Sequence, residues 1–499
     1  MKQFALLVTL LGVFTLTAQT EIEKVTETVN KSDIEGHIYF LADDVLKGRE
    51  TGTPELKIAA SYLANAFRGY GVKPNPKTGT YYQEVAFNRV SPPAKASIKI
   101  NDQTITDFAF VLPSPIKADM DAVFLNYGMA DDYAGKDVKG KVIIIKAGSE
   151  DAKDARASFG LRGKKQELAK KNGVTAIIEL LNTDDNMWSF IDHNFNTPRL
   201  IVAENEDEND KSSDDQMAHL WVLDKDAKMS EKFSSSKSLN TKMIIGEKEE
   251  EPVTSYNVIG VVEGTDPNLK DEYIIYSAHY DHVGIGTPDE TGDTIYNGAR
   301  DNAVGTTTVL SMAENLAKYP TKRSALFILF TGEEKGLLGS KYYVENPVLP
   351  LNQMVYCFNS DNGGYNDTSL ATIVGLTRTT AEKNIMSAAT TFGLTAIEDP
   401  AKEQGLFDRS DNVNFAKKGI PAPTFSLGFT SFDGEVTKYY HRPGDEAHTL
   451  DYDYLLKFFR AYVLSGRNIA NDVATPTWVT GDKYEEASKA LYKTKTIKN

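Results

Sequence analysis

Short apolar runs alternate with amphipathic stretches through the second half of the chain. The runs YIIYSA, SALFILF and MVYCF have the length and the aromatic and β-branched content of buried strands. Between and after them, residues 302–320 and 451–473 carry apolar positions at helical spacing. Strands separated by helices predict parallel pairing, with helices on both faces of a single α/β sheet.

The first half of the chain has a different pattern. Residues 30–75 read as helices, but from about residue 114 short strand-like runs dominate: VFLNYG, KVIIIKAG and VTAIIELL, with one amphipathic helix among them. A chain of 499 residues is too long for one ordinary core. The sequence therefore predicts a β-rich domain at 114–250, inserted into an α/β domain made of 19–113 and 251–475. Residues 476–499 are predicted to form a polar tail.

The N-terminus has the pattern of a secretory signal. Lys2 precedes an apolar run from Phe4 to Phe14, and Ala18 supplies a small residue for cleavage. We predict a signal peptide at 1–18 and an exported protein, periplasmic or secreted. No later stretch approaches the ~20 apolar residues of a membrane helix, so no membrane partner is expected after cleavage.

Charge and cysteine content narrow the class further. The 70 acidic and 55 basic side chains give a net charge of −15, which argues against nucleic-acid binding because that requires clustered positive charge. Cys357 is the single cysteine, so no intramolecular disulfide can form. Its position inside MVYCF predicts a buried, inert thiol.

The candidate chemistry lies where the predicted strands end. Because the carboxyl ends of parallel strands meet at one edge of a sheet, side chains that follow successive strands are expected to converge. Five residues of metal-ligand type occupy such positions or the loops beside them: His279, Asp301, Glu334, Asp361 and His441. Zn²⁺ accepts imidazole nitrogen and carboxylate oxygen, and five ligands suit two ions if one carboxylate bridges them.

Two further acidic residues have predicted supporting roles. Asp281 stands two positions after His279 and is placed to hold the other nitrogen of its ring. Of the adjacent pair Glu333 and Glu334, one can bind metal while the other accepts a proton from water.

Five motifs, SAHYDHVG, GARDNAVGT, TGEEKGLLGS, NSDNGG and YYHRPGDE, occur in this order. Together they resemble the co-catalytic zinc aminopeptidases of metallopeptidase family 28, over roughly 25–110 and 252–472. The resemblance implies the zinc exopeptidase fold, a mixed, mostly parallel sheet with helices on both faces, interrupted by a protease-associated domain. It also implies the site roles: Asp301 as bridging ligand, His279 and Asp361 on one zinc, Glu334 and His441 on the other, Glu333 as general base and Tyr440 polarising the reaction intermediate.

The resulting expectation is a two-zinc exopeptidase acting on peptides, foremost an aminopeptidase. A carboxypeptidase or dipeptidase of the same fold is the first alternative. Its support is Arg300, which replaces an acidic residue common in the family and could pair with a ligand or substrate carboxylate. A glutaminyl-cyclase-like acyltransferase with one zinc and a non-catalytic binding protein are the others. The preferred terminal residue and the oligomeric state are not predicted.

Overall fold

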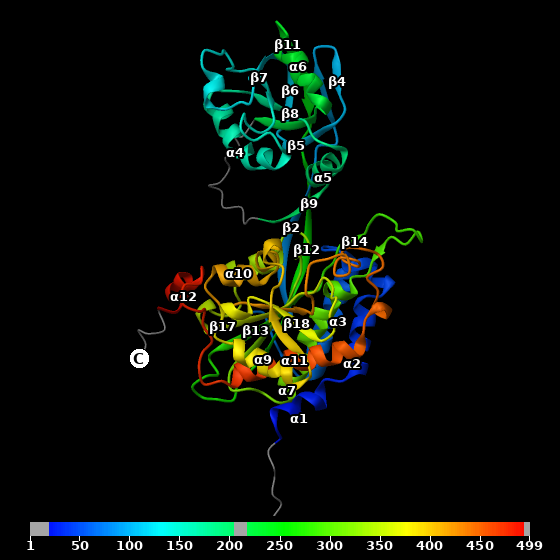
Figure 1. The fold of residues 1–499 in the computed structure, drawn as a ribbon, viewed down its shortest axis with the longest axis vertical. Coiled ribbons are helices and arrows are strands. Elements are labelled where there is room, and N and C mark those ends of the chain that lie inside the picture. The colour runs from blue at the N-terminus through cyan, green and yellow to red at the C-terminus, as the bar shows by residue number, and fades with distance from the viewer. Residues whose placement is uncertain (1–18, 204–216, 494–499) are drawn as a thin grey trace, which may run out of the picture. The chain divides into compact units, whose positions relative to one another are not determined.

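The computed structural model describes residues 19–203 and 217–493, so the predicted signal peptide lies outside the described residues. The chain divides into two compact units (Figure 1). Unit 1 comprises the residues up to 85 together with those from 254 onward, and unit 2 comprises 86–253. No helix in the described part of the chain is long and apolar enough to cross a membrane.

Unit 1 is built on a mixed sheet in which the central strands are parallel. Strand β13 (Tyr273–His279) lies between β16 (Ser324–Phe330) and β17 (Met354–Ser360) and is parallel to both. On one side β20 (Thr424–Leu427), β18 (Leu370–Val374) and β19 (Thr395–Glu398) follow; on the other side lie β12 (Glu249–Val262) and β2 (Tyr82–Ser91). Strand β12 is antiparallel to β16 and β18 is antiparallel to β20, which confirms the predicted mixed, mostly parallel sheet.

Helices cover both faces of this sheet because its strands are apolar on both sides. Ile274 and Tyr276 pack in one cluster and Ile275 in the other, as the period-two alternation of a strand requires. The first cluster contains α1 (Glu21–Thr28), α2 (Lys31–Leu41), α3 (Pro54–Tyr70), α7 (Gly305–Lys318), α9 (Glu382–Thr391) and α11 (Tyr452–Asn471). The second contains α8 (Leu338–Glu345) and α10 (Asn412–Lys417). Cys357 lies fully buried in it, where burial raises the pKa of the thiol to about 12, as expected for an inert core residue.

Local sequence signals set the ends of the helices beside the site. Thr53 caps α3 by accepting a hydrogen bond from Leu56 N, and Pro54 occupies the first helical turn. Gly71 ends the same helix at φ 81°, a left-handed conformation that glycine adopts without steric cost.

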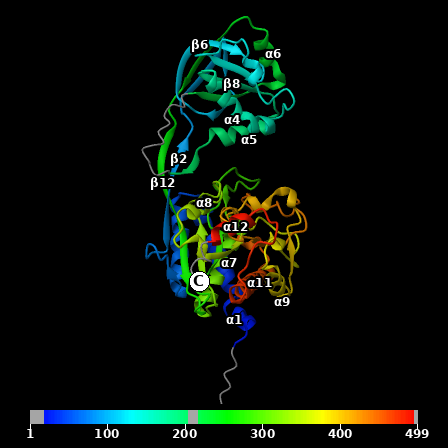
Figure 2. The ribbon, with the colours of Figure 1, turned by 90° about the vertical axis from the view of Figure 1, so that its left-hand side faces the viewer.

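Unit 2 has its own eight-stranded sheet, and its boundaries differ from the prediction (Figure 2). In sheet order the strands are β4 (Gln103–Ile105), β3 (Ala96–Ile100), β11 (Leu239–Ile245), β6 (Ile116–Phe124), β7 (Val142–Lys146), β8 (Ala176–Leu181), β10 (Ala218–Leu223) and β5 (Phe108–Leu112). Helices α4 (Ala155–Lys171), α5 (Asp185–Asn196) and α6 (Lys228–Ser234) accompany them. The predicted start at 114 is wrong, because β3, β4 and β5 pair inside this sheet and the unit begins at 86.

The segment predicted as a polar tail packs against unit 1. Trp478 is 4% exposed, donates a hydrogen bond from Nε1 to Gly419 O at 3.1 Å, and lies with its ring centre 6.3 Å from that of Phe407 in a tilted arrangement. Helix α12 (Glu485–Tyr492) follows, and Tyr492 Oη donates to Met354 O. Up to residue 493, this segment therefore belongs to the second core cluster and is not a solvated tail.

Candidate metal centre

The predicted ligands converge because three neighbouring parallel strands end at one edge of the sheet. His279 is the last residue of β13. Glu334 follows β16 and Asp361 directly follows β17, the two strands that flank β13. The register of these pairs thus brings one imidazole and two carboxylates to the same edge.

Asp301 and His441 reach the site from loops. Asp301 lies just before α7, where its backbone N–H donates to Asp445 Oδ2 at 3.2 Å. Ala299 N also donates a hydrogen bond, at 3.0 Å, to the backbone carbonyl oxygen of Asp445. His441 lies between β20 and α11 at φ 50°, four residues before Asp445. Asp445 therefore ties the loop of one predicted ligand to that of another.

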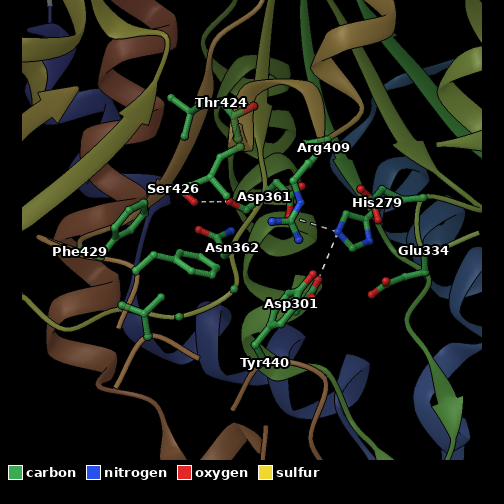
Figure 3. Close-up of a pocket in the computed structure, with 18 residues that line it drawn as sticks. His279, Asp301, Glu334, Asp361, Asn362, Arg409, Thr424, Ser426, Phe429 and Tyr440 are labelled. Carbon is green, nitrogen blue, oxygen red and sulfur yellow. Dashed lines mark hydrogen bonds and ion pairs between the residues drawn. The ribbon is translucent and has the colours of Figure 1, made fainter. Parts of the chain in front are cut away.

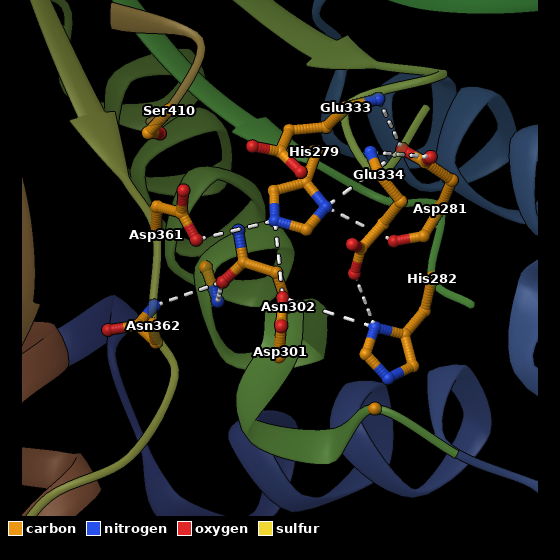
Figure 4. Close-up of polar contacts among 12 residues, drawn as sticks. His279, Asp281, His282, Asp301, Asn302, Glu333, Glu334, Asp361, Asn362 and Ser410 are labelled. Carbon is orange, nitrogen blue, oxygen red and sulfur yellow. Dashed lines mark hydrogen bonds and ion pairs between the residues drawn. The ribbon is translucent and has the colours of Figure 1, made fainter. Parts of the chain in front are cut away.

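The two carboxylate oxygens of Asp301 face different histidines. Oδ1 lies 3.4 Å from His279 Nε2, and Oδ2 lies 3.2 Å from His441 Nε2. Each histidine has a second carboxylate: Asp361 Oδ1 lies 3.3 Å from His279 Nε2 (Figure 4), and Glu334 Oε2 lies 3.2 Å from His441 Nε2. The five residues thus form two donor sets that share Asp301, and His282 lies within reach of the set that contains Glu334 and His441.

The spacing of these donors fits zinc. Four ligands at 2.0–2.1 Å around a tetrahedral ion lie ~3.3 Å apart. The four separations between nitrogen and oxygen, from 3.2 to 3.4 Å, agree with that value and exceed the usual length of a charge-assisted hydrogen bond. The donor chemistry, two imidazoles and three carboxylates, is also that of zinc sites.

Opposite charges hold the site together. Burial by itself would raise the pKa of Asp301, but hydrogen bonds with His279 and His441 bring it below its ordinary value. Burial and the charge of Asp301 would raise the pKa of Glu334. Hydrogen bonds with His282 and His441 outweigh both effects and lower this pKa to about 2. Burial works against protonation of His441, yet its contacts with Asp301 and Glu334 raise its pKa to about 10.

Glu333 and Glu334 point in different directions (Figure 4). The side chain of Glu334 lies beside His282 and His441, whereas Glu333 lines the pocket next to His279. Burial raises the pKa of Glu333 well above its ordinary value. Both glutamates line the pocket, and the assignment of one to metal binding and the other to proton transfer stays a prediction.

The prediction for the side chain of Asp281 is wrong. His279 Nδ1 donates to the backbone carbonyl of Asp281 at 3.1 Å, while the carboxylate Oδ1 is 3.9 Å away. The carboxylate instead accepts the backbone N–H groups of Glu333, at 3.2 Å, and Glu334, at 3.4 Å. A fully buried carboxylate requires several donors, and these N–H groups together with Thr51 supply them.

The N-terminal segment also contributes to the site, although no motif in the sequence predicted it. Thr51 Oγ1 donates to Asp281 Oδ2 at 2.7 Å. The buried Arg49 guanidinium donates to the carbonyls of Tyr280, Leu41, Asn297 and Gly298. Its partners at 280 and beyond are more than 230 positions away, so no local pattern marks this residue.

Arg300 does not pair with any carboxylate among the five predicted metal ligands, and its guanidinium already has protein partners. Its Nη1 lies 3.0 Å from Asp445 Oδ1 and 2.7 Å from Thr449 Oγ1, and its guanidinium stacks 3.9 Å from the centre of the Tyr439 ring. Asp445 is not among the predicted ligands. Arg300 thus fixes the loop that carries His441, and its support for a carboxypeptidase is lost.

A pocket of about 100 Å³ opens from the donor groups (Figure 3). Tyr440, which burial keeps protonated by raising its pKa, lies on its wall, stacked on His441 at 4.1 Å. Arg409 has an exposed side chain at the same pocket. The apolar part of the lining consists of Val374, Leu406, Phe429, Phe432 and Val436.

Fold and site together define unit 1 as an α/β unit of the metallopeptidase class. Residues 257–464 match the profile of peptidase family M28. Aminopeptidase YwaD of Bacillus subtilis is 32% identical over 199 residues, which cover 38% of this chain and 40% of that protein. A protein named probable leucine aminopeptidase 2, from Aspergillus oryzae, is 27% identical over 254 residues, or 51% of this chain and 43% of that protein.

The chain thus spans about two fifths of the length of these curated relatives. Among solved structures, the aminopeptidase from Aneurinibacillus sp. strain AM-1 superposes with a TM-score of 0.58 at 22% identity, covering 90% of this chain and 96% of that one. This likeness shows the fold.

Proposed function

We propose that the chain is an exported, two-zinc aminopeptidase that removes N-terminal residues from peptides. The observation that carries the proposal is the position of Asp301, whose two oxygens face His279 and His441 separately. A carboxylate in this position suits a shared ligand between two ions. The relatives named aminopeptidases, together with the signal-peptide pattern, support the choice of reaction and of compartment.

In this proposal His279 and Asp361 would hold one ion, Glu334 and His441 would hold the other, and Asp301 would be the ligand common to both. Bound zinc would supply Lewis-acid polarisation of the scissile carbonyl and acidify a water molecule. Glu333, on the pocket wall, takes the proton of the attacking water and passes it to the leaving amine. Tyr440 donates a hydrogen bond from its hydroxyl to the carbonyl oxygen as negative charge develops there.

The apolar lining supports peptides with an apolar N-terminal residue as substrates. Burying the side chain of leucine or phenylalanine against this lining gains roughly 1.5–3 kcal/mol, whereas a charged side chain would lose its hydration there.

The assignment of unit 2 as a protease-associated domain stays a prediction.

One observation favours the rival carboxypeptidase or dipeptidase: the exposed Arg409 at the pocket matches a substrate carboxylate. A panel of peptides separates the two reactions. An aminopeptidase cleaves leucyl substrates with a blocked C-terminus and leaves N-acetylated peptides intact. Cleavage of N-acetylated peptides with a free C-terminus would instead establish the rival.

The mechanism is tested with Glu333→Gln and Glu334→Gln. Glutamine keeps size but cannot accept the proton, so Glu333→Gln should retain zinc and lose at least ~10²-fold in kcat. Glu334→Gln should lower zinc content, because a neutral amide is a poorer ligand. If both variants keep zinc and full activity, with folding verified by circular dichroism, the mechanism is wrong.

A further inference from the structure

His282 is a buried histidine that the proposed function leaves without a role. It lies three residues beyond the end of β13 and is 0% exposed. Its Nδ1 lies 2.8 Å from Glu334 Oε1 (Figure 4). The other oxygen of this carboxylate, Oε2, faces His441 Nε2 at 3.2 Å. One oxygen of Glu334 thus contacts His282, and the other faces the predicted ligand His441.

The distances distinguish a hydrogen bond from shared coordination. Donors around one tetrahedral zinc lie ~3.3 Å apart, whereas hydrogen bonds to a carboxylate measure ~2.7–2.9 Å. The 2.8 Å separation between His282 Nδ1 and Glu334 Oε1 is therefore that of a hydrogen bond. His282 Nδ1 is also 4.0 Å from Asp301 Oδ1, farther than any of the four contacts within the two donor sets. Because an ionised carboxylate can only accept, the ring proton is on Nδ1.

The surrounding backbone fixes the orientation of this ring. His282 N donates to Arg49 O at 3.1 Å, and Arg49 Nη2 donates to Gly298 O at 3.0 Å. Gly298 packs against the imidazole: a Cβ at this position would lie 2.5 Å from His282 Cδ2. With φ at 61°, Gly298 also has a conformation that disfavours larger residues. The ring is therefore held between the N-terminal segment and the loop that leads to Asp301.

We propose that His282 is a positioning residue for Glu334. By donating from Nδ1 to Oε1, it fixes the rotation of the carboxylate so that Oε2 is presented to the zinc shared with His441. A glutamate without this bond would lose orientation entropy on binding the ion and bind it more weakly. The inference rests on the proposed function, since it assigns Glu334 to a zinc ion.

The test compares two substitutions at one position. His282→Leu removes the donor, whereas His282→Asn places an amide N–H close to the position of Nδ1. Stepwise zinc affinities are measured by competition with a chromophoric chelator on the full chain. We expect His282→Leu to bind one of the two ions ~10–100-fold more weakly, the usual effect of losing a group that orients a ligand, and His282→Asn to restore most of the affinity. Anomalous diffraction at the zinc edge should then show the retained ion at His279 and Asp361.

His37→Leu is the matched control. His37 also makes two hydrogen bonds, with Tyr62 and Tyr70 at 2.8 Å each, but it contacts none of the donor groups. This variant should bind both ions as the wild type does. The retained ion in His282→Leu reports independently that the variant has folded.

Three results would overturn the inference. If His282→Leu binds both ions with wild-type affinity, the hydrogen bond does not position Glu334. If His282→Asn loses the ion as completely as Glu334→Gln, His282 is itself a ligand. If the wild type binds no zinc, the proposed function fails and this inference fails with it. The first two results leave the proposed function intact.

Discussion

Thr51 donates a hydrogen bond to Asp281 across 230 positions of the chain, and this bond connects the N-terminal segment to the metal centre. Both side chains are buried. Since Asp281 accepts the backbone N–H groups of Glu333 and Glu334, the hydroxyl of Thr51 orients the carboxylate that places both glutamates. The turn before α3 is therefore a structural part of the site, although none of the predicted metal ligands lies in it.

Thr51→Val should lower both stability and zinc affinity. Valine has the same shape but leaves Asp281 Oδ2 short of a donor, which costs about 1–3 kcal/mol of unfolding free energy. Urea unfolding and zinc competition measure the two effects. Thr307→Val is the control, because Thr307 Oγ1 is buried without a hydrogen-bond partner among the described residues. Equal losses in the two variants would contradict the role of Thr51.

Asp301→Asn and Asp361→Asn should differ in zinc stoichiometry. Asp301 faces both histidines, whereas Asp361 lies 3.3 Å from His279 Nε2 and belongs to one donor set. After dialysis against a weak chelator, elemental analysis should find both ions depleted in Asp301→Asn and a single ion depleted in Asp361→Asn. Loss of one ion in each variant would show that Asp301 is not shared.

A buried ionic cluster should make unit 2 sensitive to acid. Glu179 pairs with Lys165, accepts a hydrogen bond from Trp221 Nε1 at 2.7 Å, and lies 2.9 Å from His219 Nε2, all in the interior. Burial alone would raise the pKa of Glu179, but the hydrogen bond of His219 and the charge of Lys165 lower it. Because the folded pKa lies below the unfolded value of about 4.3, the stabilisation is complete above that pH and is lost as the pH falls through the folded pKa.

Glu179→Gln should therefore destabilise unit 2 by about 3–5 kcal/mol at pH 7, since it leaves the charge of Lys165 buried and unpaired. The difference from the wild type should shrink as the pH falls below the unfolded value of about 4.3 and through the lowered pKa of the folded carboxylate. Urea midpoints from pH 7 to 3, followed by tryptophan fluorescence, measure this. Asp137→Asn, which removes an exposed partner of Lys141, should shift the midpoint little. A pH-independent difference for Glu179→Gln would refute the ionic explanation.

Shortening the chain after Thr475 should destabilise unit 1. The change removes Trp478, which is 4% exposed, and α12; truncating a buried tryptophan alone typically costs about 3–5 kcal/mol. A chain ending at Lys493 keeps these contacts and serves as the control. Thermal unfolding should separate the two chains by several degrees, and coincident curves would show that the packing of this segment contributes nothing.

The order of strands, helices and ligand-type residues was predictable because each depends on local pattern. Buried strands and amphipathic helices have distinct hydrophobic periods, and polar residues such as His279 and Asp361 interrupt them where the strands end. Parallel pairing then implies that these residues meet. The mixed sheet and the convergence of five metal-type residues followed from that reasoning and from a family resemblance.

Boundaries and supporting contacts were not predictable, because they depend on pairing between distant segments. Strands β3 to β5 carry no mark of which sheet they join. Only the pairing of β5 with β10, of β3 with β11 and of β4 with β3 places them in unit 2. Trp478 reads as part of a polar segment until its packing near Phe407 is seen.

The same holds within the site. The sequence determined which side chains could bind zinc, since ligand chemistry is a property of each residue. The tertiary structure decided that Asp281 holds the backbone of the two glutamates while Thr51 and His282 orient carboxylates, because a buried polar atom takes whichever partner the fold brings within hydrogen-bond reach.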